Sequence, residues 1–146
     1  KKLEGKDLKK GMFKFTLKEA DSNWQVKSNG LTKTVSNESD GGILFRLNIA
    51  KEGTYNYIVK EVNDGQSDIV YDKREVRVVV TVYETEEGEL KVRDIKQQGD
   101  GVFTNKFRRI IIKTGDTTKI AIYVVALAGA LTALVVLVKK RKKKDS

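Results

Sequence analysis

Apolar and polar residues alternate along much of the chain before position 107, and each alternating run is short. The runs are Phe13 to Leu17, Ile43 to Leu47, Tyr55 to Val59, Val76 to Val82 and Leu90 to Val92. Alternation of this kind is typical of half-buried strands. Turns rich in Asn, Asp and Gly separate the runs, and no segment before Ile120 shows a helical period. The pattern predicts an all-β fold, an antiparallel immunoglobulin-like sandwich of about seven strands, with a barrel as the alternative.

The end of the chain has a different pattern. Residues from Ile120 to Val138 form an uncharged, almost wholly apolar run, and Lys and Arg fill positions 139–144. Nineteen residues in a helix cover roughly 28 Å, close to the hydrocarbon thickness of a bilayer. The basic cluster is expected on the cytoplasmic side. We therefore predict a domain over 1–107, a linker over 108–118, a transmembrane helix over 119–138 and a cytoplasmic tail over 139–146.

Charge and composition narrow the possible functions. The net charge is +9, but from Asp116 onward the chain has seven basic and two acidic residues, so the preceding part carries only +4. Its basic residues are scattered among acidic ones, which argues against nucleic-acid binding. The chain has no Cys and no His. This excludes zinc sites built on those residues, His-based triads and Cys nucleophiles, and we predict no metal or cofactor. Lys1 begins directly in domain-like sequence, so we expect a longer secreted protein.

Three polar residues stand where the alternation expects apolar ones. Lys1 is two residues before Leu3, Glu61 continues the series that ends at Val59, and Asn105 lies between two phenylalanines. Side chains two apart share a face of a strand, so the pattern aims all three at the core. The alternatives are a solvated Lys1 with Lys2 taking its place, a Glu61 that points to water, and an Asn105 in a turn.

A Lys amine, a Glu carboxyl and an Asn carboxamide that meet in an apolar core could react. Burial lowers the pKa of Lys1 and raises that of Glu61, which favours a neutral amine and a neutral acid. The amine could then attack the Asn105 side-chain carbonyl while Glu61 moves protons. Loss of ammonia would leave a Lys–Asn isopeptide bond. The domain would be its own substrate and not an enzyme. We interpret Asp72 as a turn residue.

Several motifs occur together along the chain. They are KKLEGKDL at the start, GMFKFTL from Gly11, GTYNYIVKEV from Gly53, Tyr71-Asp72, the Val76–Val82 strand and the closing Phe103-Thr104-Asn105. In order and spacing they resemble the pilin isopeptide-linkage domain of Gram-positive surface proteins, and the resemblance covers residues 1–107. The resemblance implies that Lys1 and Asn105 form the crosslink and that Glu61 assists. The family's lysine lies within its first strand, whereas Lys1 here stands at the beginning, where a strand end can fray.

The tail resembles a cell-wall sorting signal, in which an LPxTG-like pentapeptide precedes an apolar span and a basic end. The pentapeptide position reads Ile111-Ile112-Lys113-Thr114-Gly115. Ile112 replaces the proline, which would set a kink that sortase-type transpeptidases recognise. The resemblance implies cleavage between Thr114 and Gly115 by a sortase and attachment to peptidoglycan. A simple C-terminal membrane anchor is the alternative.

Together these features predict a structural protein. We expect a stalk or pilus-type domain on the surface of a Gram-positive bacterium, crosslinked internally, held by one membrane span and attached to the cell wall. Neighbouring surface or pilus subunits are the expected partners. The alternative is a membrane-tethered adhesin without the bond or sortase processing, whose loops 36–42 or 63–68 would hold a host ligand that the sequence does not identify. No set of catalytic residues for an enzyme stands out.

Overall fold

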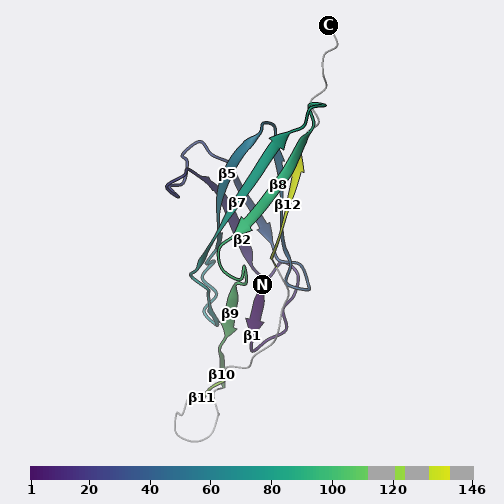
Figure 1. Cartoon of the computed structure of the whole chain (residues 1–146). Coiled ribbons are helices and arrows are strands. Elements are labelled where there is room, and N and C mark those ends of the chain that lie inside the picture. Colours follow the sequence, from purple (N-terminus) through teal and green to yellow (C-terminus); the bar gives the residue numbers. More distant parts are fainter. Residues whose placement is uncertain (112–120, 124–131, 139–146) are drawn as a thin grey trace, which may run out of the picture.

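The computed structural model describes residues 1–111, 121–123 and 132–138 of the chain (Figure 1). One layer is a five-stranded antiparallel sheet in the order β3-β2-β5-β7-β8. Its strands are β2 (Lys14–Ala20), β3 (Thr32–Ser36), β5 (Gly53–Glu61), β7 (Glu75–Glu84) and β8 (Leu90–Gln97). Most of these strands bury alternate side chains, as in β7 and β2. The five-stranded sheet therefore has one face directed at the core and one at solvent.

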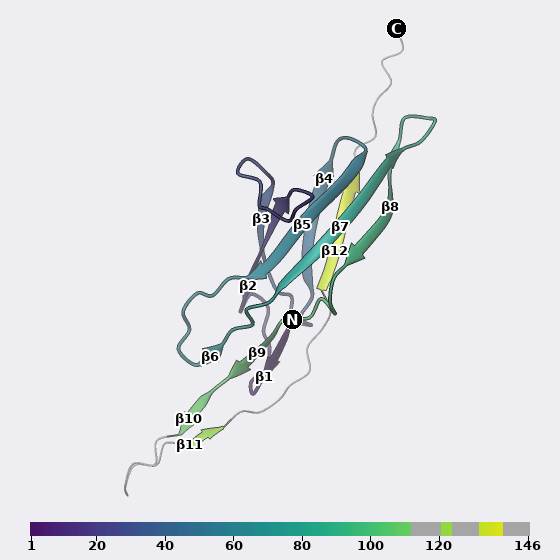
Figure 2. The same ribbon diagram turned by 60° about the vertical axis from the view of Figure 1, so that its left-hand side comes forward.

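The second layer consists of β4 (Ile43–Ile49) and a small three-stranded sheet. This sheet has the order β1-β9-β6, formed by β1 (Lys2–Glu4), β9 (Thr104–Phe107) and β6 (Ile69–Val70). Figure 2 shows the small sheet near the N-terminus, between the longer strands and the β10–β11 pair, and β4 beside the longer strands. The all-β sandwich predicted from the alternation is confirmed, with nine strands in residues 1–107 where about seven were expected.

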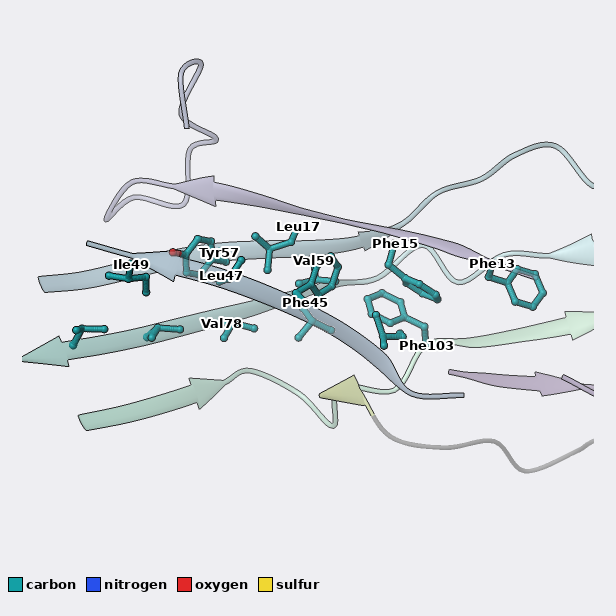
Figure 3. Packing of buried hydrophobic residues seen from close by; sticks show 14 of the residues in the cluster. Phe13, Phe15, Leu17, Phe45, Leu47, Ile49, Tyr57, Val59, Val78 and Phe103 are labelled. Carbon is teal, nitrogen blue, oxygen red and sulfur yellow. The ribbon is translucent and has the colours of Figure 1, made fainter. Parts of the chain in front are cut away.

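The core lies between the layers and includes several phenylalanines (Figure 3). Phe15 from β2 and Phe103 from the segment before β9 have ring centroids 5.3 Å apart. Leu17, Phe45, Leu47 and Val80 are also buried, each with 1% or less of its surface exposed. Each fully buried side chain of this kind contributes about 1.5–3 kcal/mol by removal from water. The aromatic end of this core is where the N-terminal residue enters the fold.

The prediction of purely antiparallel pairing is wrong at β1 and β9. These strands pair in parallel, with Lys2 opposite Thr104 and Leu3 opposite Asn105. Alternation in a sequence gives the face of each side chain but not the direction of the neighbouring strand. The first and last strands of the domain therefore lie side by side and run in the same direction. The chain enters the domain at the start of β1 and leaves it at the end of β9, so these two points lie at opposite ends of the strand pair.

The short strands of the last part of the chain are β10 (Arg109–Ile111), β11 (Ala121–Tyr123) and β12 (Thr132–Val138). β10 pairs with β11 antiparallel, and β12 pairs with β4 in parallel. Many residues of β12 are β-branched and suit a strand. No helix in the described ranges is long and apolar enough to cross a bilayer. Half of the positions of the helix predicted over 119–138, namely 119–120 and 124–131, lie outside the described residues, and the helix stays a prediction.

A buried asparagine ties the loop before β2 to the end of β3. Asn37 has no exposed surface. Its Oδ1 accepts a hydrogen bond from the Phe13 main-chain N–H at 2.9 Å, and its Nδ2 donates to the carbonyl oxygens of Lys9 and Glu38, both at 2.9 Å. These bonds satisfy main-chain groups that have no partner strand at this point. Asn37 thus holds the segment 9–13 in place, and this segment positions Phe13 in the core.

We predict that Asn37→Ala lowers the free energy of unfolding by about 2–3 kcal/mol, because the buried Phe13 N–H and two carbonyls lose their partner. The measurement is urea denaturation followed by circular dichroism. Asn48→Ala, on the exposed side of β4, serves as the control and should change stability little. Equal midpoints for the two variants would contradict the assigned role of Asn37.

Candidate functional site

Lys1 enters the aromatic end of the core directly before β1. Its side chain has no exposed surface. The main-chain nitrogen of Lys1 donates to the Gly41 carbonyl at 2.6 Å, and the next N–H, of Lys2, donates to the Phe103 carbonyl at 2.8 Å. These bonds hold the residue in line with the strand rather than leaving it frayed. The Nζ atom lies 4.7 Å from the centre of the Phe13 ring, which attracts a cation and excludes water.

Glu61 meets this amine from the opposite layer. It is the last residue of β5 and stands opposite Phe15 of β2 in the sheet register. Its carboxylate is fully buried, and both oxygens lie 3.0 Å from Lys1 Nζ. The alternation through Val59 predicts this inward direction, and the structure buries the side chain. An amine and a carboxyl are thereby brought into direct contact inside an apolar environment.

Asn105 completes the cluster from β9. Its side chain is fully buried. The Nδ2 atom donates to Glu61 Oε1 at 2.6 Å, and the Oδ1 atom accepts from the Asp72 main-chain N–H at 2.8 Å. Glu61 therefore contacts both Lys1 and Asn105. In the described residues, no buried side-chain nitrogen or oxygen lacks a hydrogen-bond partner, so the cluster is fully satisfied.

Burial sets the protonation of the pair. Desolvation lowers the pKa of the Lys1 amine from 10.5 to about 8, against the attraction of Glu61. Desolvation also raises the pKa of Glu61, against the opposing effect of Lys1. Both shifts favour the neutral forms. Transfer of a proton from the Lys1 amine to the Glu61 carboxylate therefore has a modest free-energy cost. With a pKa of about 8, a fraction of the Lys1 amine is neutral near neutral pH.

Sequence reasoning missed the contribution of Asp72, which it placed in a turn. The residue does lie between β6 and β7, but its N–H holds the Asn105 carbonyl and its carboxylate accepts from the Thr104 N–H at 2.9 Å. Arg74 donates to the same carboxylate from its guanidinium at 2.7 Å and from its main-chain N–H at 3.0 Å. Burial alone would raise the pKa of Asp72, yet these hydrogen bonds lower it to about 2.

The other predicted positions are placed as follows. Lys2, the alternative nucleophile, is partly exposed in β1 and has no contact with Glu61 among the described interactions. Ile111 is the last residue of β10. Ile112, Lys113, Thr114 and Gly115 lie outside the described residues. Within the described ranges, no group of three or more acidic side chains could hold a metal ion.

Comparison with known protein families gives two matches. Residues 1–108 match the family model FctA, described as a Spy0128-like isopeptide containing domain. Residues 113–145 match the LPXTG cell wall anchor motif. No curated protein and no solved structure matches the chain. The first match covers every described residue of the buried cluster, and the second begins within the pentapeptide that resembles a sorting signal.

We predict that the Lys1 amine titrates near pH 8 in Asn105→Ala, a variant in which the amine has no carboxamide to attack. Glu61→Ala in this background should lower the pKa of Lys1 further, because the attractive charge is lost and the burial remains. The measurement is an NMR titration of the lysine side chains, with Lys1→Met identifying the signal. An amine that titrates at 10.5 in the folded chain would contradict a buried Lys1.

Proposed function

We infer the function from one premise: the chain belongs to the FctA family of Spy0128-like isopeptide-containing domains. With the LPXTG cell wall anchor motif, this makes it a sortase-anchored, pilus-type protein of the Gram-positive cell surface. We propose that its domain crosslinks itself through an isopeptide bond between Lys1 and Asn105, with Glu61 as the proton carrier. The observation that supports the proposal is the contact of Glu61 with both partners, 3.0 Å from the amine and 2.6 Å from the carboxamide nitrogen.

The reaction would proceed by addition and elimination. Transfer of a proton from the Lys1 ammonium to Glu61 gives a neutral amine and a neutral acid. The amine lone pair attacks Cγ of Asn105, and the carbonyl electron pair moves to Oδ1. Glu61 then protonates Nδ2 and takes up the proton that the attacking nitrogen loses. The Cγ–Nδ2 bond breaks, ammonia leaves, and a secondary amide joins Lys1 to Asn105. The domain is consumed as its own substrate, so we do not regard it as an enzyme.

The bond would serve a mechanical purpose. By the loop-entropy estimate made for disulfides, closing a loop of about a hundred residues contributes about 4–5 kcal/mol. The path of force matters more. β1 and β9 are parallel neighbours, so tension between the two ends of the domain would shear their hydrogen bonds. A bond from Lys1 to Asn105 would carry that tension covalently and leave most of the domain unloaded. A covalent crosslink of this kind suits a stalk whose extracellular domain contains no cysteine and so cannot form a disulfide.

Anchoring is the second part of the proposal. We propose that the apolar run of 120–138 holds the chain in the membrane as one helix until a sortase cleaves between Thr114 and Gly115 and joins Thr114 to peptidoglycan. The run contains no charged residue, and a basic cluster follows it, as a membrane stop on the cytoplasmic side requires. Within a bilayer, a helix satisfies all backbone hydrogen bonds of a single span.

We predict that the folded 146-residue chain, kept in detergent, has an intact mass lower than its sequence mass by one ammonia. Glu61→Ala and Asn105→Ala should each restore the full mass expected for the variant, since the first lacks the proton carrier and the second lacks the reacting carboxamide. Asn48→Ala, which removes an exposed carboxamide on β4, should still lose one ammonia. A folded wild-type chain of full sequence mass would contradict the crosslink.

We also predict that Thr114→Ala abolishes attachment to the wall in a Gram-positive host with a sortase. The wild-type chain should appear in the covalently wall-linked fraction, and the variant should stay with the membrane. Thr118→Ala, outside the pentapeptide, is the matched control and should behave as wild type. Ile112→Pro should increase the wall-linked share, because it restores the backbone kink. Equal wall-linked fractions for Thr114→Ala and Thr118→Ala would contradict the assigned cleavage site.

A further inference from the structure

The orientation of the Asn105 carboxamide is fixed at both ends. A main-chain N–H can only donate, so the atom that faces Asp72 N at 2.8 Å is the carbonyl oxygen. The amide nitrogen accordingly faces Glu61 at 2.6 Å. The leaving group thus points at the acid that would protonate it, and the oxygen points at a separate donor on the loop between β6 and β7. This division is what an addition to Cγ requires.

Negative charge would develop on one atom during that addition. When the Lys1 amine adds to Cγ, the carbonyl electron pair moves to Oδ1, which becomes an oxyanion until ammonia leaves. A donor already aimed at this oxygen stabilises the charge without reorganisation, and the effect is largest where water is excluded. Asn105 has no exposed surface, and the Asp72 N–H occupies the position of such a donor.

The N–H is held in place by the Asp72 side chain. The carboxylate, with 8% of its surface exposed, accepts from the main-chain N–H of Thr104, the residue directly before Asn105. It also accepts from the main chain and the guanidinium of Arg74, and Arg74 Nη2 donates to the Val102 carbonyl. The loop that carries the donor is therefore bonded to the start of β9 at Thr104 and to Val102 just before this strand, and donor and acceptor keep their alignment.

We propose that the Asp72 main-chain N–H is the oxyanion donor of the crosslinking reaction and that the Asp72 carboxylate is its positioning group. The inference rests on the proposed function, because it assigns a role within the same reaction. It differs from a structural role, in which Asp72 only ties the loop to β9. A structural role affects stability, whereas an oxyanion donor affects the rate at which folded chains lose ammonia.

The test replaces the peptide bond between Tyr71 and Asp72 by an ester, which removes this N–H and leaves every side chain unchanged. The full chain is assembled by chemical ligation, so it starts unfolded and unreacted, and the loss of ammonia is followed by intact mass after folding in detergent. We expect a rate lower by on the order of 100-fold. The control is an ester between Gln97 and Gln98, which removes the N–H that donates to the Arg77 carbonyl at 2.9 Å, outside the site.

Circular dichroism of both ester chains is the check that each of them folds. Crosslinking of the 71–72 ester at the rate of the control would overturn the proposal. If the all-amide chain loses no ammonia, the proposed function fails as well. This outcome differs from the expected one, in which the all-amide chain loses ammonia and the 71–72 ester chain does so more slowly.

A second pair of variants keeps the backbone intact if the ester chain does not fold. Asp72→Asn keeps one oxygen, which in the place of Oδ2 can still accept from the Thr104 N–H and the Arg74 guanidinium, and loses the bond from the Arg74 main-chain N–H to Oδ1. The rate should therefore fall less than in Asp72→Ala. Asp72→Ala releases the loop, and we expect a rate about tenfold lower among folded chains. Wild-type rates for both variants would overturn the positioning role.

Discussion

The chemistry proposed for this domain depends on one interaction, the burial of the Lys1 ammonium group against the Glu61 carboxyl group. Lys1 and Glu61 meet with no exposed side-chain surface, beside two phenylalanine rings. Moving both charges out of water costs several kcal/mol for each ion, and their attraction repays this cost only in part. The fold therefore holds a pair whose neutral forms cost less to reach than they do in water, as the lowered pKa of Lys1 and the raised pKa of Glu61 indicate. In the proposed reaction the amine becomes an uncharged amide, so crosslinking would relieve the cost of its burial.

The sandwich architecture brings the three groups together from distant parts of the chain. Lys1 precedes β1, Glu61 ends β5 in the opposite layer, and Asn105 lies in β9 beside β1. All three lie at the aromatic end of the core, where Lys1 Nζ is 4.7 Å from the centre of the Phe13 ring and 5.8 Å from that of Phe15. Because β1 and β9 are parallel neighbours, the bond proposed between Lys1 and Asn105 would also lie in the path of tension between the two ends of the domain.

Much of this arrangement could be predicted from the sequence, because strands reveal their inward face by alternation. The inward direction of Lys1, Glu61 and Asn105 follows from Leu3, Val59 and Phe103, and the structure buries all three. Their mutual contact required the resemblance to a family, since alternation does not say which faces meet. The parallel pairing of β1 with β9 was missed for the same reason. β3 was missed because it buries little apolar surface and has an exposed-to-intermediate pattern throughout.

Asp72 shows a different limit. Its contribution comes from a main-chain N–H, which every residue except proline carries, so no side-chain pattern could identify it. The carboxylate does have a sequence signal, an Asp two residues before an Arg, but such pairs are common in turns. Its meaning depends on the Thr104 N–H, which is more than thirty residues away in the chain and 2.9 Å away in the fold.

The most direct test of the central claim is tandem mass spectrometry of a tryptic digest of the folded, wild-type chain. The account predicts a branched peptide in which Lys1–Lys2 is joined to residues 97–106, lighter than the two separate peptides by the ammonia lost at Asn105. Fragment ions should place the branch between Lys1 Nζ and Asn105 Cγ. Recovery of the 97–106 peptide only in its linear form, with an intact Asn105 carboxamide, would contradict the account.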